Sequence, residues 1–322
     1  MKKNIAIFSG GNSGEFEVSV KSAEVVCKHL DKDFYQPYLI TVKDDDWTFE
    51  DAEGMIYQVD RKNMSLDLPG GKVLFDKVFN AIHGTPGEDG RLQVYFDEAG
   101  IPCTSCDFVT SALTFNKYLC ICYLSNLGIL TAESLLLRHG DEVLPEDIVS
   151  KIGLPCFVKP NKGGSSVGIS KVSEISGILS AVKNALVEDD EVIIEKFVPG
   201  REITCGVMIK DGEVLALPVT EIISKNEFFD YGAKYFGESD EITPAQIPDE
   251  IDSACKRLSV DLYQELSCKG VVRFDYIYND SGMYFLEVNT IPGLTEESIV
   301  PQQAREAGIS LKELFTDLLE QS

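Results

Sequence analysis

The first 30 residues place a strand, a glycine loop and a helix in that order, and this order constrains the fold more than any other feature of the chain. Ile5–Ser9 is a short apolar run typical of a buried strand. Glycines and small polar residues occupy positions 10–14, and apolar residues at helical spacing follow from Val18 to Leu30. The order predicts an α/β fold with a parallel sheet, which binds its ligands at the carboxyl ends of its strands.

Composition sets the outer limits of the fold and of the partners. With 322 residues, 44% of them hydrophobic and 25% charged, the chain suits two or three globular domains and is neither disordered nor fibrous. The 29 Lys and Arg face 53 Asp and Glu, a net charge of −24, which argues against binding to nucleic acid or to an anionic membrane. No apolar run approaches the roughly 18 residues of a membrane span, and the N-terminus lacks a signal-peptide pattern. We therefore expect a soluble cytoplasmic protein.

The nine cysteines are expected to be free thiols. Their number is odd, and they are scattered from Cys27 to Cys268 in a chain that is too large to need disulfides for stability. The pair Cys103 and Cys106 forms a CxxC, but no second CxxC completes a zinc site. Burial of the thiols is the better interpretation.

Two further sections follow the first hundred residues. A helix at Asn116–Asn126 precedes two strands, Cys156–Lys159 and Ile169–Val172, and the glycine-rich stretch between these strands predicts a hairpin. A second antiparallel pair is expected at Ile203–Ile209 and Val214–Thr220. The segment 224–243 has no periodicity, and a loop of that length inside a domain is usually a functional lid. The chain is completed by a helix at 249–266, strands at 271–278 and 283–289, and a helix at 311–319.

The last strand pair carries polar side chains that suit a metal ion. Because side chains alternate along a strand, Arg273 and Asp275 share one face, and Glu287 and Asn289 share one face of the next strand. Two carboxylates and a carboxamide are hard oxygen ligands for one or two Mg²⁺ ions that bridge phosphates. A polar solvent face on an edge strand is the alternative. Gly293 follows, where backbone N–H groups can approach a reacting oxyanion whose charge Arg273 shares.

A second candidate site is the hairpin tip between Lys159 and Gly168. A lysine at a strand end followed by Gly and Ser is typical of a loop whose N–H groups cradle phosphate, although a plain flexible hairpin shows the same pattern. Residues 164–168 also match G-x-S-x-G, but a nucleophile elbow leads into a helix and this segment leads into a strand. The chain has no Walker A motif, so any ATP site here is not of the P-loop kind.

The N-terminal glycine loop and the loop after the third strand carry acids and a histidine. Acids in a first helical turn commonly complement the helix dipole, which is sufficient to explain Glu17. Glu15 lies nearest to the glycines and is the better candidate to face a ligand amine. His83 begins the loop 83–90 and is either a ligand contact or a hydrogen-bonding group that fixes the loop.

Four separated blocks, taken in this order, resemble the D-alanine–D-alanine ligases of the ATP-grasp superfamily. The blocks are Gly10-Gly11-x-Ser13-x-Glu15-x-Glu17-Val18-Ser19, His83-Gly84-x-x-Gly87-Glu88-Asp89-Gly90, Gly164-Ser165-Ser166-Val167-Gly168 and Glu287-Val288-Asn289-Thr290-Ile291-Pro292-Gly293. The resemblance covers essentially the whole chain. It implies an ATP-grasp fold of three α/β domains, at 1–103, 104–195 and 196–322, with ATP between the central and C-terminal domains and a lid at 224–243.

The resemblance also implies a reaction and an assembly. In the family, the carboxylate of one D-alanine attacks the γ-phosphorus of ATP, and the amine of a second D-alanine then displaces phosphate from the acyl phosphate. The dipeptide serves peptidoglycan precursor synthesis. A homodimer and a requirement for Mg²⁺ or Mn²⁺ are further implications.

By matched position, the resemblance gives each site residue a role. Toward D-alanine, Glu15 would hold the first ammonium with His83 nearby, Ser298 would bind the second carboxylate, and Arg273 with the Gly293 N–H would form the oxyanion site. Toward ATP, the phosphates would contact Lys117, Lys159 and Lys234, the adenine Glu195 and Val198, and the ribose Glu202. The metal would be held by Asp275, Glu287 and Asn289. Ser165 and Tyr235 would link with Glu15 across the closed site.

The chain departs from the family pattern at a few positions, and competing functions stay open. Asn116 stands where the family commonly has Asp, Phe16 where it often has Arg, and Asn161-Lys162-Gly163 where relatives carry Ser-Arg-Glu or similar. A ligase that takes D-lactate or D-serine second is the first competitor, and Tyr235 favours D-alanine. A non-catalytic nucleotide or amino-acid sensor is the next, and an NAD-linked dehydrogenase is a poor third.

Overall fold

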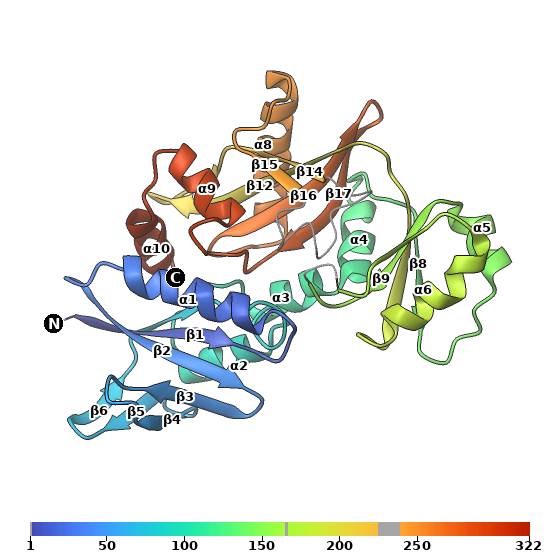
Figure 1. Cartoon of the computed structure of the whole chain (residues 1–322). Coiled ribbons are helices and arrows are strands. Elements are labelled where there is room, and N and C mark those ends of the chain that lie inside the picture. Colours follow the sequence, from blue (N-terminus) through green and yellow to red (C-terminus); the bar gives the residue numbers. More distant parts are fainter. Residues whose placement is uncertain (1, 165–166, 225–238) are drawn as a thin grey trace.

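The N-terminal strand, loop and helix build the first of three sheets. The structure is a computed structural model that describes residues 2–164, 167–224 and 239–322. In it, β1 (Lys3–Gly10) pairs in parallel with both β2 (Tyr35–Lys43) and β7 (Lys77–Asn80), and α1 (Phe16–His29) connects β1 to β2 (Figure 1). The predicted parallel sheet is therefore confirmed.

An antiparallel meander widens this sheet beyond β2, and the sequence patterns did not indicate it. The seven strands run in the order β6-β5-β4-β3-β2-β1-β7, where the added strands are β3 (Asp46–Glu50), β4 (Ile56–Asp60), β5 (Ser65–Leu68) and β6 (Gly71–Leu74). Each of the four is at most five residues long and buries only one or two side chains, or none. Strands that short leave no clear alternation in the sequence.

The second sheet contains the predicted glycine-tipped hairpin. β9 (Cys156–Pro160) pairs antiparallel with β10 (Ser170–Val172), so the strand that excluded a nucleophile elbow is present. β11 (Glu191–Lys196) and β8 (Ser134–Arg138) complete the order β10-β9-β11-β8. Two helices bury apolar residues against this sheet, with a short 3₁₀ turn, η1 (Ile175–Gly177), before the second: α5 (Pro145–Ile152) and α6 (Ile178–Ala185).

The third sheet confirms the last strand pair and corrects two expectations. Its strands are β12 (Arg201–Lys210), β13 (Glu213–Ala216), β14 (Thr220–Ser224), β15 (Ser239–Ile242), β16 (Val272–Asn279) and β17 (Gly282–Asn289). The single strand expected at 214–220 is wrong, because β13 ends at Ala216 and Thr220 already belongs to β14, which pairs with another part of β12. Residues 239–242 of the expected lid loop are strand β15, paired with β14. The rest of that segment, 225–238, lies outside the described residues.

The two faces of the third sheet have different partners. Phe274 and Tyr276 on β16 point into an apolar core that includes Leu262 and Tyr263 of α8 (Asp249–Glu265). Because side chains alternate, Arg273 and Asp275 lie on the opposite face. That polar face is turned toward the loops at the carboxyl ends of β1 and β7.

The C-terminal helices attach the third sheet to the first. α9 (Ile299–Glu306) and α10 (Leu311–Glu320) share one apolar core with β1, α1 and β7. In this core the rings of Phe79 and Phe315 meet edge to face at 5.8 Å, an arrangement that adds to the stability gained by burial. Figure 1 shows α10 beside α1, with the C-terminus close to the first sheet. The two parts that form the site are thereby held against each other.

Three helices link the first sheet to the second: α2 (Arg91–Ala99), α3 (Phe108–Phe115) and α4 (Lys117–Asn126). The helix predicted at 116–126 is confirmed, with Asn116 as its N-cap: the side-chain oxygen accepts the N–H of Leu119 at 3.0 Å. Of the helices that the structure describes, α2, α3, α5 and α9 were not predicted.

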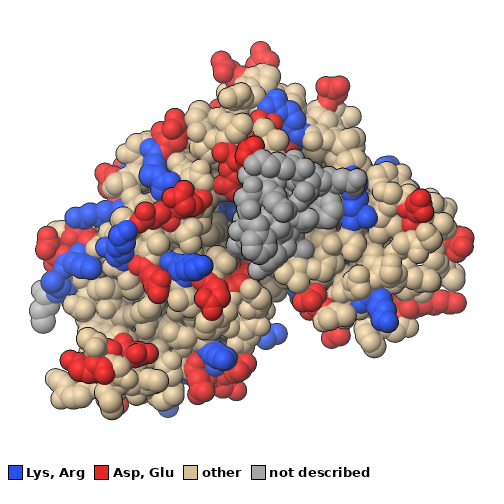
Figure 2. All heavy atoms as spheres, viewed as in Figure 1, with Lys and Arg blue, Asp and Glu red and all other residues tan. Residues whose placement is uncertain are grey.

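All nine cysteines are free, as expected. Among the helices of the described residues, none is both long and apolar enough to cross a membrane. On the face shown in Figure 2, acidic and basic side chains are interspersed.

Candidate active site

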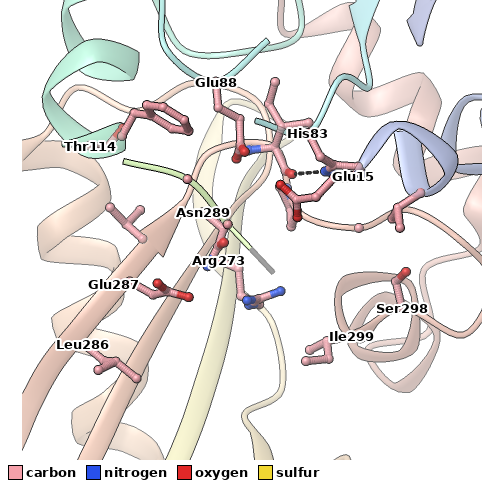
Figure 3. A pocket seen from close by; sticks show the side chains of 18 of the residues that line it. Glu15, His83, Glu88, Thr114, Arg273, Leu286, Glu287, Asn289, Ser298 and Ile299 are labelled. Carbon is pink, nitrogen blue, oxygen red and sulfur yellow. Dashed lines mark hydrogen bonds between the residues drawn. The ribbon is translucent and has the colours of Figure 1, made fainter. Parts of the chain in front are cut away.

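A cavity of about 410 Å³ lies between the loops of the first sheet and the polar face of the third (Figure 3). Its walls come from the start of α1, the loop after β7, strands β16 and β17, and the segment from β17 into α9. The junction of α3 and α4, the glycine loop at 163–164 and Glu241 of β15 also line it. The predicted site residues that line it are Glu15, His83, Lys117, Arg273, Glu287, Asn289, Gly293 and Ser298. The structure thus brings together residues from both ends of the chain.

Glu15 lies between two glycines at the start of α1. A Cβ atom on Gly84 would be 3.3 Å from its Oε2, and a Cβ atom on Gly164 would be 2.7 Å from the same oxygen. The Ser13 hydroxyl accepts the N–H of Glu15 at 3.2 Å and donates to the carbonyl of His83 at 3.0 Å. The glycine loop of the second sheet therefore approaches this carboxylate closely, which only residues without a side chain permit.

His83 and Glu88 face the segment that follows β17. His83 is 5% exposed, its Nδ1 lies 2.7 Å from the carbonyl oxygen of Ile291, and its Nε2 lies 3.1 Å from the Ser22 hydroxyl. Burial lowers the pKa of His83, and the charge of Glu15 acts in the opposite direction. Burial, followed by the charge of Glu15, raises the pKa of Glu88 to about 8. Of the two roles left open for His83, the loop-fixing one is the one that these contacts support.

The strand pair β16–β17 carries the predicted polar group on one face. Arg273 is directly opposite Asn289, and Asp275 is opposite Glu287. Arg273 donates two hydrogen bonds to Asp275, at 2.9 and 2.8 Å, and Asn289 donates a third at 3.0 Å. Burial disfavours the charge of Arg273, but the carboxylates of Asp275 and Glu287 outweigh it and raise the pKa of this guanidinium. Asp275 lies behind Arg273 and is not among the residues that line the cavity.

Gly293 and Ser298 meet at the entrance of α9. A Cβ atom on Gly293 would be 2.8 Å from the Ser298 hydroxyl, so the backbone of this loop passes directly over that side chain. The Ser298 hydroxyl forms a hydrogen bond of 2.7 Å with that of Thr295, and it does not cap α9 although Ser298 is the N-cap residue. The first N–H groups of the helix therefore remain available to an anion near Ser298.

The unusual residues at 116 and 161 contact each other. The Asn161 amide donates to the side-chain oxygen of Asn116 at 3.0 Å, and its own oxygen accepts the N–H of Tyr118 at 2.8 Å. Lys117 donates from Nζ to the carbonyl of Gly163 at 2.5 Å. Two departures from the family pattern thus contact each other, and these bonds tie the glycine loop to α4.

Four residues expected to contact ATP lie outside this cavity: Lys159 for the phosphates, Glu195 and Val198 for the base, and Glu202 for the ribose. Lys159 on β9 and Glu195 on β11 form an ion pair of 2.5 Å, with each side chain only 6% exposed. Oε1 of Glu195 is buried and has no hydrogen-bond partner among the described residues. Val198 lies in the connection from β11 to β12, and Glu202 is on β12. A buried acceptor without a donor fits a ligand that brings its own N–H group.

Three predicted site residues, Ser165, Lys234 and Tyr235, lie outside the described residues. Conversely, three cavity-lining acids, Glu88, Glu241 and Glu297, had no role assigned from the sequence. Glu88 belongs to the block at 83–90 that resembles the family, so the sequence could have indicated it. Glu241 on β15 accepts a hydrogen bond of 3.0 Å from Gln302, and burial raises its pKa while Arg273 lowers it. No pattern in 224–243 could have indicated Glu241.

Comparison with known proteins gives consistent matches along the chain. The family profiles "D-ala D-ala ligase N-terminus" and "D-ala D-ala ligase C-terminus" match residues 4–106 and 124–320. A D-alanine–D-alanine ligase of Flavobacterium johnsoniae is 50% identical, over 99% of both chains. Among solved structures, the VanG D-Ala:D-Ser ligase of Enterococcus faecalis has a TM-score of 0.87 at 32% identity, over 99% of both chains. The D-alanine–D-alanine ligase of Bacillus anthracis complexed with ATP has a TM-score of 0.79 at 28% identity, over 99% of this chain and 97% of that one.

Proposed function

The chain belongs to the D-alanine–D-alanine ligase family, and we propose that it joins two D-alanine molecules through an acyl phosphate formed with ATP. The observation that carries this proposal is the convergence of Glu15, Arg273, Gly293 and Ser298 on one cavity. A carboxylate is a poor electrophile, and phosphorylation gives it the leaving group that attack by an amine requires. The cavity offers an anion for the ammonium of one substrate and donors for the negative charge that develops during attack.

Each wall of the cavity has a role in this proposal. Glu15 holds the ammonium of the first D-alanine, whose carboxylate attacks the γ-phosphorus. Arg273 and the Gly293 N–H stabilise the oxyanion when the second amine attacks the acyl carbon and phosphate leaves. Ser298, with the open N-terminus of α9, binds the second carboxylate. By the family resemblance, Ser165 and Tyr235, which lie outside the described residues, would link with Glu15.

We place ATP between the second and third sheets. Glu195 supports this, because its unpartnered Oε1 suits the exocyclic amine of adenine, and Val198 in the β11–β12 connection supplies backbone groups beside it. Glu202 would accept from the ribose hydroxyls. Lys117, Lys159 and Lys234 would neutralise the phosphates, since phosphoryl transfer depends mainly on positioning and charge neutralisation.

We infer from the family resemblance that Asp275, Glu287 and Asn289 would hold a divalent ion. Glu287 and Asn289 line the cavity, whereas Asp275 would exchange a hydrogen bond from Arg273 or Asn289 for the ion. Asp275 and Glu287 are directly opposite each other, and Asn289 lies on the same face, where its amide group already contacts Asp275. Hard oxygen donors favour Mg²⁺, or Mn²⁺, which when bound would neutralise phosphate charge.

Three further features stay predictions of the family resemblance. They are a homodimer, which sedimentation equilibrium would detect, a location in the cytoplasm, where ATP is available, and domain boundaries at 103 and 195.

The second substrate is the sharpest test of the proposed function. Given ATP, Mg²⁺ and D-alanine with equal D-serine or D-lactate, the enzyme is expected to release phosphate and to form mainly D-alanyl-D-alanine. Chromatography of the products checks this. Preferential incorporation of D-lactate or D-serine would reassign the second subsite, and absence of D-alanine-dependent phosphate release would favour a sensor.

Gly164→Ala tests the approach of the glycine loop to Glu15. The added methyl group would lie 2.7 Å from the carboxylate, so either the loop or Glu15 must move. We expect the KM for D-alanine to rise on the order of tenfold or more, with little change in the melting temperature. Gly70→Ala is a control at an exposed glycine that has open space around its Cβ position and no left-handed backbone. An unchanged KM in Gly164→Ala would contradict the contact.

A further inference from the structure

The segment 290–294 after β17 is held by hydrogen bonds from the first sheet. The Ile291 carbonyl accepts from Nδ1 of His83 at 2.7 Å, and the Ile291 N–H donates to Oε1 of Glu88 at 3.2 Å. The N–H of Leu294 donates to the Ser22 hydroxyl at 3.2 Å. The segment follows β17, the last strand of the third sheet. All three of its partners lie in α1 or in the loop after β7.

The direction of these bonds fixes the state of His83. A carbonyl oxygen can only accept, so Nδ1 must carry the proton. In the neutral ring Nε2 is then an acceptor, and the Ser22 hydroxyl, 3.1 Å away, donates to it. The N–H of His83 itself donates to the Ser19 hydroxyl at 2.9 Å. Both ring nitrogens are therefore used in holding Ile291 and Ser22.

Glu88 joins two loops through its two carboxylate oxygens. Oε2 accepts the N–H of Gly84 at 2.7 Å, within its own loop, while Oε1 accepts the N–H of Ile291. Figure 3 shows Glu88 and His83 on the same side of the cavity, across from Arg273. One side chain thus sets the distance between the loop after β7 and the segment after β17.

The bonds on either side of Gly293 determine where its N–H points. Each peptide unit is planar, so holding the N–H and the carbonyl of Ile291 fixes the two peptide units that flank this residue. The Leu294 N–H fixes the unit after Gly293, and the ring of Pro292 restricts φ between them. Glycine has the greatest backbone freedom of all residues, so the orientation of the Gly293 N–H depends on these outside contacts.

We propose that Glu88, His83 and Ser22 are positioning residues that aim the Gly293 N–H at the oxyanion of the acyl intermediate. We call the hydrogen bonds from Glu88, His83 and Ser22 to Ile291 and Leu294 the clamp. The proposal rests on the proposed function for the oxyanion, but the clamp itself is a property of the protein without substrate. Through the clamp, the orientation of the Gly293 N–H depends on α1 and the loop after β7, where the first substrate is proposed to bind.

The charges around Glu88 connect the clamp to that substrate. Glu15 faces Glu88 from α1 and Lys117 faces it from α4, while His83, in the same loop, is neutral. Burial and the charge of Glu15 favour the protonated form of Glu88, whereas Lys117 and the two N–H donors favour the ionised form. A substrate ammonium bound at Glu15 would cancel that charge. Glu88 then ionises more readily, and both of its oxygens become good acceptors.

The test combines Glu88→Gln with Glu17→Gln as a matched control. Glutamine keeps the size of the side chain but has only one acceptor oxygen. Its NH₂ group therefore lies opposite the N–H of either Gly84 or Ile291, and two donors cannot form a hydrogen bond. Glu17 is exposed, lies outside the cavity and has no part in the clamp. Hydrogen exchange of the peptide covering 290–294, followed by mass spectrometry without substrates, reports the clamp directly. We expect about tenfold faster exchange there in Glu88→Gln and none of this change in Glu17→Gln.

Kinetics then test what the clamp does. Loss of one oxyanion donor typically costs on the order of 10²–10³ in kcat, so a misdirected donor is expected to lower kcat about tenfold to a hundredfold. The Kd for ATP should stay within about twofold. Ser22→Ala, which removes the partner of Leu294, should show the same pattern more weakly, and it serves if Glu88→Gln folds poorly.

Unchanged exchange at 290–294 would refute the clamp, and faster exchange with unchanged kcat would refute its positioning role. A parallel loss of ATP affinity would indicate a general structural effect and also overturn the proposal. If the unmodified protein does not ligate D-alanine, the proposed function fails, and the exchange measurement still decides whether the clamp exists.

Discussion

Replacing Arg273 by alanine is expected to lower kcat on the order of 10²–10³-fold while the Kd for ATP changes little. The reason is that the negative charge which Arg273 stabilises develops on the acyl group only during reaction, so its loss affects the transition state more than the bound nucleotide. Steady-state kinetics and calorimetric titration with ATP measure the two quantities. Equal losses of ATP affinity and turnover would contradict the oxyanion role.

A loss of folding stability in Arg273→Ala must be distinguished from the loss of kcat. Arg273 is the charge partner of Asp275, and its removal leaves buried carboxylates uncompensated. Arg201 provides a matched control, because it binds Glu221 of the same sheet through two contacts of 2.7 Å and does not line the cavity. Arg201→Ala is expected to lower the melting temperature and leave kcat within about twofold. Arg273→Lys keeps the charge without the paired geometry and should restore stability more than turnover.

The second large effect is expected at the buried ion pair of the second sheet. Glu195→Leu leaves the ammonium of Lys159 buried without a counter-charge, which typically costs about 3–5 kcal/mol of unfolding free energy. The double variant Lys159→Met with Glu195→Leu removes both charges and is expected to recover most of that loss. Neither variant should bind ATP. Urea unfolding and calorimetry with ATP measure the two properties.

A surface pair provides the comparison. Lys196, which is 51% exposed, contacts Glu133 at 3.4 Å, and Lys196→Met is expected to cost less than about 1 kcal/mol. A double variant that remains as unstable as Glu195→Leu would show that packing rather than charge dominates at this site. Retained ATP affinity in the double variant would remove Lys159 and Glu195 from the nucleotide site.

The parallel sheet and the metal-type strand pair were predictable because each depends on local order and on alternation. Ile5–Ser9 followed by the glycine loop could form little else than a strand that enters a helix, and Arg273 and Asp275 had to share a face of any strand that contained them. Glu241 could not be found in this way. It reaches the cavity only because β15 pairs with β14 across a long segment, and pairing between distant strands leaves no periodic signal.

His83 shows where sequence reasoning must stop at two alternatives. Its position beside a glycine loop is compatible both with a ligand contact and with a structural hydrogen bond. Only the approach of Ile291, 208 positions later, provides the acceptor that fixes its proton on Nδ1. The pair Asn116 and Asn161 is similar, since each departure was unexplained alone and the contact between them was visible only in the fold.

The sequence by itself determined the family and the type of sheet, and it gave the candidates for the reacting groups, because motifs and periodicity are properties of neighbouring residues. The tertiary structure decided that Ser22, His83 and Glu88 hold the loop of Gly293, and that Lys159 and Glu195 neutralise each other in the second sheet. Hydrogen bonds and buried charges act over about 3 Å, so their partners are set by how distant elements pack.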